Sequence, residues 1–275
     1  MLRLRYRSDT LVPIEAPAIR PDTLAGLSLG EIERLTVYHG NRQEPLAEFF
    51  DLVGGDPSDA HLVIEGDCAR VKWLGAQMQT GTLRIEGNAG MHTGAEMRGG
   101  HLLVTGNTGD WLGAEMRGGL IEVHGDTGHL PGAGYRGSRK GMRGGCILVR
   151  GNAGNEVGAL MRRGLIAVGG SVGDFAGVSL IAGTILLFGP AGIRPGAGMK
   201  RGTIALLGPS VPLLPSFRHA CQFQPTFLAL YLRQLQAWHF PPASRFDMPP
   251  LMHRYNGDLV ALGKGEILTV ASPTL

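Results

Sequence analysis

The hydrophobic positions between residues 82 and 219 return every 19 residues, and each return has the same form. A six-residue segment carries Leu, Ile or Val at its second and fourth positions and glycine at its sixth. Because strand side chains alternate in direction, positions 2 and 4 are predicted to face a common interior. The segments are Thr82–Gly87, His101–Gly106, Leu120–Gly125, Cys146–Gly151, Leu165–Gly170, Thr184–Gly189 and Thr203–Gly208, with a looser copy at His61–Gly66.

Glycine also recurs at positions 9, 13 and 19 of the repeat, and methionine is usual at position 16. Glycine supplies corners with φ > 0 at no steric cost, and methionine fills a narrow interior. A short period with fixed glycines is typical of a chain stacked on copies of itself. We therefore predict an all-β fold, a right-handed parallel β-helix (solenoid) of about eight coils, with a small α/β N-terminal cap and a C-terminal helical extension. The glycines assigned a structural role are Gly87, Gly106, Gly125, Gly151, Gly170 and Gly189.

The flanking regions are not periodic and divide the chain into three predicted parts. In the first part, residues 1–60, Ser28 and Glu31 have the spacing of a capping box, which predicts a short helix followed by a strand over residues 35–39. The coils occupy residues 61–219. In the last part, residues 220–275, the apolar spacing over residues 225–238 predicts a helix that packs on the coils, and a hairpin is predicted around residues 263–265.

Composition limits the function without defining it. The net charge of +3 is too small to indicate nucleic acid, and no apolar stretch is long enough to span a membrane or opens the chain as a signal peptide. Three separated cysteines without a C-x-x-C motif predict neither disulfides nor a metal site. We expect a cytoplasmic protein that contacts neither nucleic acid nor membrane.

The outward positions 1, 3 and 5 change in character along the repeats. Thr82, Arg84 and Glu86 form an ordinary solvated face, whereas the last three repeats carry mainly apolar residues at the same places. Such a face is too apolar to be left in water. The sequence leaves two coverings open, the chain's own C-terminal helix and another protein.

A row of basic residues occupies position 17 of the repeat. Neighbouring members of the row would lie about 4.8 Å apart, where like charges repel. Two interpretations remain open: Glu96, Glu115 and backbone carbonyls neutralise the row, or it contacts an acidic subunit surface or a polycarboxylate ligand. The members are Arg98, Arg117, Arg143, Arg162 and Lys200.

The sequence contains no convincing catalytic constellation, and we predict no catalytic residue. His61 and His101 share a column but are expected about 10 Å apart, too far to share a metal. His92 and His129 fall near turns beside Asp110, where a histidine is normally solvated. No serine lies in a G-x-S-x-G elbow.

The repeat resembles the glycine-repeat domain of the glutamate synthase large subunit and the C subunit of formylmethanofuran dehydrogenase. The resemblance rests on the pattern Gly-Asn/Asp-x-Gly…Gly-Ala-x-Met-x-x-Gly. The second family also matches outside the coils, at residues 37–41, 46–54 and the insert at residues 134–145. Because the amidotransferase and synthase domains of glutamate synthase are absent, the dehydrogenase C-subunit family is favoured over a regulatory glutamate-synthase-like module.

The resemblance implies a non-catalytic structural subunit. In the favoured setting, a formyltransferase/hydrolase complex moves a formyl group from tetrahydromethanopterin to a methanofuran-type cofactor and releases formate during one-carbon oxidation. Its implied partners are an amidohydrolase-like hydrolase, a formyltransferase and a dehydrogenase-B-like subunit. No cofactor is expected to be bound by this chain alone. The alternatives are the C subunit of a molybdenum or tungsten formylmethanofuran dehydrogenase and, from another class, a free-standing β-helix enzyme acting on an anionic polymer.

Overall fold

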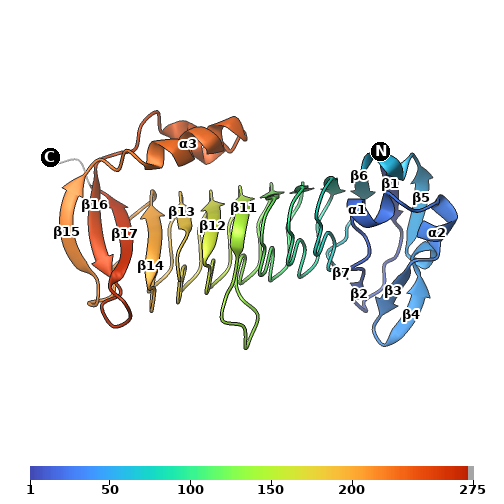
Figure 1. Cartoon of the computed structure of the whole chain (residues 1–275), viewed down its shortest axis with the longest axis horizontal. Helices are drawn as coiled ribbons and strands as arrows, with labels where there is room; N and C mark the ends of the chain where they lie inside the picture. Colours follow the sequence, from blue (N-terminus) through green and yellow to red (C-terminus); the bar gives the residue numbers. More distant parts are fainter. Residues whose placement is uncertain (272–275) are drawn as a thin grey trace.

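The computed structural model describes residues 1–271, and its main feature is a sheet of thirteen strands (Figure 1). In the middle of this sheet each repeat adds one strand, and equivalent positions of neighbouring repeats lie opposite each other in parallel pairs, as Ile121 does with Leu102 and Ile147. The strands of this region are β6 (His61–Glu65), β8 (Thr82–Glu86), β9 (His101–Val104), β10 (Leu120–Val123), β11 (Arg143–Val149), β12 (Arg163–Val168), β13 (Thr184–Leu187) and β14 (Arg201–Leu206).

The segments that connect these strands also lie on one another. Isolated parallel bridges link equivalent residues of successive repeats from Cys68 to Ala191. Backbone hydrogen bonds between repeats accompany them, such as the 2.9 Å bond from the N–H group of Gly106 to the carbonyl oxygen of Gly87. Each connection is therefore held by the repeats on both sides, which fixes the side chains at its corners.

The N-terminal region completes one end of the main sheet and adds a second sheet. In the main sheet β1 (Leu2–Tyr6) is parallel to β6 and antiparallel to β5 (Phe50–Gly54). The second sheet has four strands, β2 (Ile14–Glu15), β3 (Thr36–His39), β4 (Arg42–Pro45) and β7 (Val71–Lys72). The helical elements are α1 (Pro21–Leu24), α2 (Leu29–Glu33), η1 (Leu46–Glu48) and η2 (Pro57–Asp59).

Helix α2 begins where the sequence predicted it. Ser28 and Glu31 form the expected capping box, in which the N–H group of Ser28 donates to the Glu31 carboxylate at 2.8 Å. This bond satisfies a donor that the helix itself leaves free.

The C-terminal region closes the other end of the main sheet. Strand β17 (Lys264–Val270) pairs in parallel with β14, and β16 (Met252–Gly257) and β15 (Arg218–Phe223) follow it in antiparallel order. A hairpin is present in this region, but its turn lies at residues 258–263 and not around residues 263–265, because residue 264 already begins β17. The buried Asp258 carboxylate holds this turn by accepting the N–H groups of Gly198 and Val260, each at 2.9 Å.

The two faces of the main sheet have different coverings. Positions 2 and 4 line a continuous core with the methionines of position 16. The opposite, outer face is covered over β12–β14 by α3 (Leu228–Ala237) and η3 (Pro241–Arg245). Figure 1 shows α3 lying along these strands. Leu228, Leu232 and Leu235 pack there with Leu186 and Phe188. Of the two coverings that the sequence left open, the chain's own helix occupies this part of the face.

The predicted all-β solenoid class is wrong. The fold is mixed α/β: a mixed, mostly parallel sheet of thirteen strands, a separate sheet of four strands, and helices in both flanking regions. The glycine repeat describes only the parallel middle of the main sheet. The antiparallel ends and most of the second sheet come from the flanking segments, and some of their pairings, such as β1 with β6 and β2 with β7, join strands about sixty residues apart in the chain. No helix within residues 1–271 is long and apolar enough to cross a membrane.

Candidate functional site

The five basic residues of position 17 lie in one column along the stacked repeats. The N–H group of each donates to a backbone carbonyl of the preceding repeat, as from Arg117 to Met97 at 2.7 Å and from Arg162 to Met142 at 2.8 Å. Ile181 occupies the place between Arg162 and Lys200. This regular bonding sets the register of the row, including Arg143, which follows the insert.

The charges of this basic row are only partly neutralised. Arg117 lies 3.7 Å from Glu96 and Arg143 lies 3.7 Å from Glu115, which are the two carboxylates that the sequence suggested. Arg98, Arg162 and Lys200 are exposed, and within residues 1–271 no carboxylate forms an ion pair with them. The three exposed cations of the row therefore remain available to an anionic partner.

Glycine is needed at position 6 mainly because the backbones of neighbouring repeats lie close together there, and less because of its conformational freedom. Gly87 alone among the six has a φ in the left-handed range. A Cβ atom on Gly106 would lie only 2.7 Å from the carbonyl group of Gly87 in the preceding repeat. The corners with positive φ fall instead at positions 13 and 19, for example at Gly113 and Gly119.

An aromatic cluster forms at position 11 of the repeat. Trp73, His92 and Trp111 follow one another at intervals of 19 residues, and their rings stack with centroid distances of 4.3 and 6.4 Å. All three have positive φ, which lets the N–H group of His92 reach the carbonyl oxygen of Asp110 in the next repeat at 2.9 Å. This interval was visible in the sequence, but the tryptophans were not recognised as members of one column.

Tyr135 of the insert completes the cluster. Its ring stacks on Trp111 with a centroid distance of 5.0 Å, and its hydroxyl lies 3.1 Å from Nδ1 of His92. Burial raises the pKa of Tyr135, and the charges of Glu96 and Glu115 act in the same direction. Burial lowers the pKa of His92, so this ring is neutral at physiological pH. His92 is thus a packed residue, and the expectation of a solvated histidine is wrong for it.

A hollow of about 700 Å³ opens beside this cluster. Trp111, Tyr135 and Arg136 line it, together with Asp110 and Glu156. The polar atoms at its edge are partly used by the backbone: Asp110 accepts the N–H group of His129 at 2.7 Å, and Nδ1 of His129 accepts that of Asn155 at 2.9 Å. His129 therefore carries its ring proton on Nε2 when neutral. These side chains tie successive repeats together.

A similar side-chain ladder runs along position 7. Oδ1 of Asn88 accepts the N–H group of Asn107, and Oδ1 of Asn107 accepts that of Asp126, both at 2.8 Å. Asp126 and Asn152 continue it by accepting the N–H groups of Asn152 and Ser171. Asn and Asp recur after the position-6 glycine because their short side chains can accept the next backbone N–H group.

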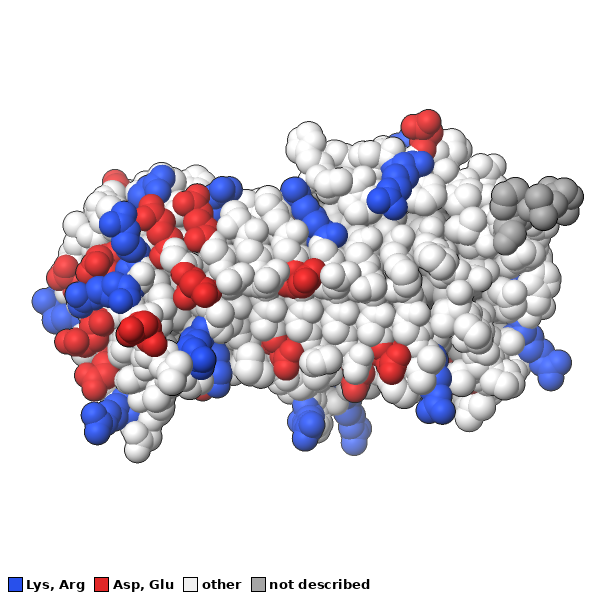
Figure 2. Space-filling view, turned by 180° about the vertical axis from the view of Figure 1, so that it is seen from behind, with Lys and Arg blue, Asp and Glu red and all other residues white. Residues whose placement is uncertain are grey.

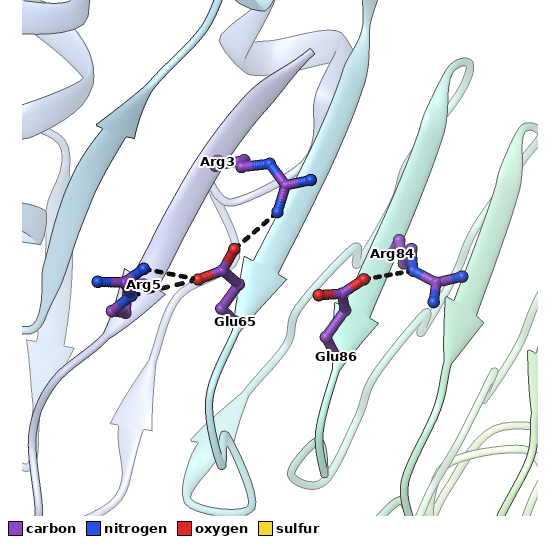
Figure 3. Close-up of polar contacts among 5 residues, drawn as sticks. All are labelled: Arg3, Arg5, Glu65, Arg84 and Glu86. Atoms are coloured by element: carbon purple, nitrogen blue, oxygen red, sulfur yellow. Dashed lines mark hydrogen bonds and ion pairs between the residues drawn. The ribbon is translucent and has the colours of Figure 1, made fainter.

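Several other charged groups on the uncovered outer face are paired. Glu65 accepts hydrogen bonds from Arg3 at 2.7 Å and from Arg5 at 3.1 Å, and Arg84 pairs with Glu86 at 2.8 Å, as Figure 3 shows. His61 and His101 both lie opposite Thr82, two strands apart as expected, and His101 contacts Glu122 at 2.7 Å. Within residues 1–271 no group of three or more His, Cys, Asp or Glu side chains is placed to hold a metal ion.

The three cysteines are expected to differ in reactivity. Burial raises the pKa of Cys68 to about 12 and that of Cys146 to about 11, whereas Cys221 is exposed. Because the thiolate is the nucleophile, iodoacetamide at about pH 8 should label Cys221 first in the folded protein. Mass spectrometry of labelled peptides checks this order. Equal labelling rates for Cys68 and Cys221 without unfolding would contradict it.

The structure as a whole defines a repeat protein whose polar side chains mainly join repeats, while a basic row and an aromatic-lined hollow remain at the surface. No protein-family model matches the chain. It is similar over 98% of its length to a chain in the crystal structure of the formyltransferase/hydrolase complex (FhcABCD) from Methylorubrum extorquens in complex with methylofuran, with 35% identity, a TM-score of 0.90 and all of that chain covered.

Two further relatives match a part of the chain. The C subunit of the molybdenum-containing formylmethanofuran dehydrogenase 1 of Methanothermobacter thermautotrophicus is 44% identical over 85 residues, 31% of this chain and 21% of that protein. The C subunit of the tungsten-containing formylmethanofuran dehydrogenase 2 of Methanothermobacter wolfeii is 41% identical over 85 residues, 30% of this chain and 31% of that protein. The match thus spans less than a third of either relative. The chain belongs to the family formed by the C subunits of formylmethanofuran dehydrogenases and the matching chain of the formyltransferase/hydrolase complex.

Proposed function

We propose that the protein is a non-catalytic structural subunit of a formyltransferase/hydrolase complex. That complex would transfer a formyl group from tetrahydromethanopterin to a methanofuran-type cofactor and release formate. The observation that carries the proposal is the match to a chain of such a complex over 98% of this chain. The matched structure contains methylofuran, which supports a cofactor of this type for the complex. The proposed partners are an amidohydrolase-like hydrolase, a formyltransferase and a dehydrogenase-B-like subunit.

The surface supports a subunit role. Figure 2 shows charged side chains crowded at the N-terminal end of the molecule and sparse over the stacked repeats on that face. A large area with few charges is typical of the buried centre of a protein–protein interface.

The cysteines bear on the location of the protein. Cys68, Cys146 and Cys221 are free thiols, which agrees with a reducing compartment, and we expect the cytoplasm as the location.

We propose the basic row as one contact of this subunit, made with an acidic neighbour or the carboxylates of the cofactor tail. Its support is geometric: five cations in one register, of which Arg98, Arg162 and Lys200 are exposed and have no ion pair within residues 1–271. A carboxylate-bearing partner gains charge-assisted hydrogen bonds at such a row.

Charge reversal at Arg117 and Arg162 tests this role. The double variant Arg117→Glu, Arg162→Glu should lower recovery of the other chains, or retention of the cofactor, by about tenfold or more, because two attractive contacts become repulsive. Co-purification with the other chains of the complex and mass spectrometry of the bound cofactor measure both. The double variant Arg42→Glu, Arg233→Glu reverses exposed cations elsewhere and serves as control. Unchanged assembly and cofactor retention in the first variant would refute a contact at the row.

A further inference from the structure

The insert in the repeat that starts at Leu120 projects from the stack as a loop of its own. It adds seven residues to the 19-residue period, and Figure 1 shows it extending beyond the neighbouring connections before β11. Residues 136, 139 and 140 of this insert are Arg, Arg and Lys, and all three are exposed. Within residues 1–271 none of them forms an ion pair. The loop therefore presents three positive charges to solvent.

The loop is fixed at its base and within its turn. The N–H groups of Gly134 and Gly141 donate to Ala159 and Leu160 of the next repeat, at 3.1 and 2.8 Å. At the tip, the N–H group of Ser138 donates to Tyr135 at 2.9 Å, and the Ser138 hydroxyl donates to the carbonyl oxygen of Lys140 at 3.2 Å. These bonds hold the backbone in one conformation.

Tyr135 fastens the same loop to the preceding repeats. Its ring lies on Trp111, its hydroxyl bonds His92, and its N–H group donates to Glu115 at 3.3 Å. The aromatic cluster therefore orients the loop that carries the three cations. A loop already held in its bound shape loses less entropy on association than a mobile one.

Hollows of about 700 and 320 Å³ flank the loop, and Arg136 lines both. A loop that projects between two hollows is more complementary in shape to the uneven surface of a protein than to an extended small ligand. Asp110 and Glu156 of the larger hollow carry the opposite charge and would offer contacts for basic groups at the margin of an acidic patch. In the basic row Arg117 and Arg143 are engaged by Glu96 and Glu115, whereas none of the loop cations has an ion pair within residues 1–271.

We propose that residues 134–141 form a prearranged basic docking loop that receives an acidic surface of a neighbouring protein subunit. The inference rests on the proposed function, since it assumes a partner in the complex, and it adds a contact separate from the basic row. Electrostatic complementarity of this kind makes association sensitive to salt.

The test compares variants of the full chain, co-expressed with the other chains of a formyltransferase/hydrolase complex and purified by a tag on this chain over a series of KCl concentrations. The variant Arg136→Glu, Arg139→Glu, Lys140→Glu should lose the other chains at about physiological salt, with apparent affinity lowered at least tenfold. The control Arg42→Glu, Arg233→Glu, Arg245→Glu reverses three exposed cations elsewhere and should assemble as the wild type does. Matching thermal melting curves of both variants would show that folding is intact.

A second variant separates charge from orientation. Tyr135→Ala keeps all three cations but frees the loop, so trypsin should cleave after Arg136, Arg139 or Lys140 faster than in the wild type, and assembly should weaken. Binding of a decaglutamate peptide to the free chain is measured as well. Binding would favour a polycarboxylate ligand, and the absence of binding would favour a protein surface.

Full assembly of the triple charge-reversal variant would overturn the docking loop, whether or not peptide binding is lost. If that variant assembles while the basic-row variant does not, the proposed function stands and this inference alone fails. A wild-type chain that elutes without any partner would refute both.

Discussion

Replacing Gly106 with alanine should destabilise the protein by about 3 kcal/mol and lower its melting temperature by roughly 6–12 °C. The added Cβ atom would lie 2.7 Å from both the carbonyl carbon and the carbonyl oxygen of Gly87. Both are backbone atoms of a neighbouring repeat that is bonded on its other side as well, so neither can move away without disturbing the stack. The clash would also lengthen the bond from the N–H group of Gly106 to Gly87.

The matched control is Gly26→Ala. A Cβ atom at Gly26 has no heavy atom within 4 Å, and the residue is exposed. Thermal and urea unfolding of both variants, followed by circular dichroism, should show a large loss for Gly106→Ala and a change within about 0.5 kcal/mol for Gly26→Ala. Equal stability of the two variants would show that repeats can separate at position 6 without cost, contrary to the close packing of Gly106 on Gly87.

The repeat could be read from the sequence because its pattern is local and recurs. Leu102, Ile121 and Ile147 share a position in the period, and they lie opposite one another in neighbouring strands. The flanking segments carry no such pattern. Strand β1 pairs with β6, about sixty residues away in the chain, and this pairing depends on packing that no periodicity encodes. The fold class was wrong for that reason.

The surface features also differ in how far the sequence could predict them. The basic row repeats with the period, so its alignment followed from position alone, whereas its charge balance depends on the distances from Arg117 to Glu96 and from Arg143 to Glu115. The stacked members of the aromatic cluster at position 11 also follow the period, but Tyr135 lies in the insert, outside the period, so the complete cluster could not be predicted. Only the folded loop brings its ring onto Trp111.

The second large loss of stability is expected from a substitution in α3, where this helix covers the outer face of the main sheet. Leu235 is fully buried against the apolar outer positions of β12–β14, whereas Leu230 on the same helix is 71% exposed. Leu235→Asp would place an unpaired carboxylate in this interface, which should cost about 4 kcal/mol and lift the helix from the sheet. Leu230→Asp makes the same chemical change in the same helix but leaves the charge in water, so stability should change by about 0.5 kcal/mol or less.

Fluorescence of a dye that binds apolar surface distinguishes local detachment of α3 from general unfolding. Once α3 leaves, Leu186 and Phe188 of the outer face become accessible, while the core on the other face stays packed. Leu235→Asp should therefore bind the dye at temperatures where circular dichroism still reports intact strands, and Leu230→Asp should not. Equal dye binding by the two variants would mean that α3 is not needed to cover this face. Because such apolar strands cannot remain in water, early dye binding by Leu235→Asp should be followed by aggregation at the exposed face.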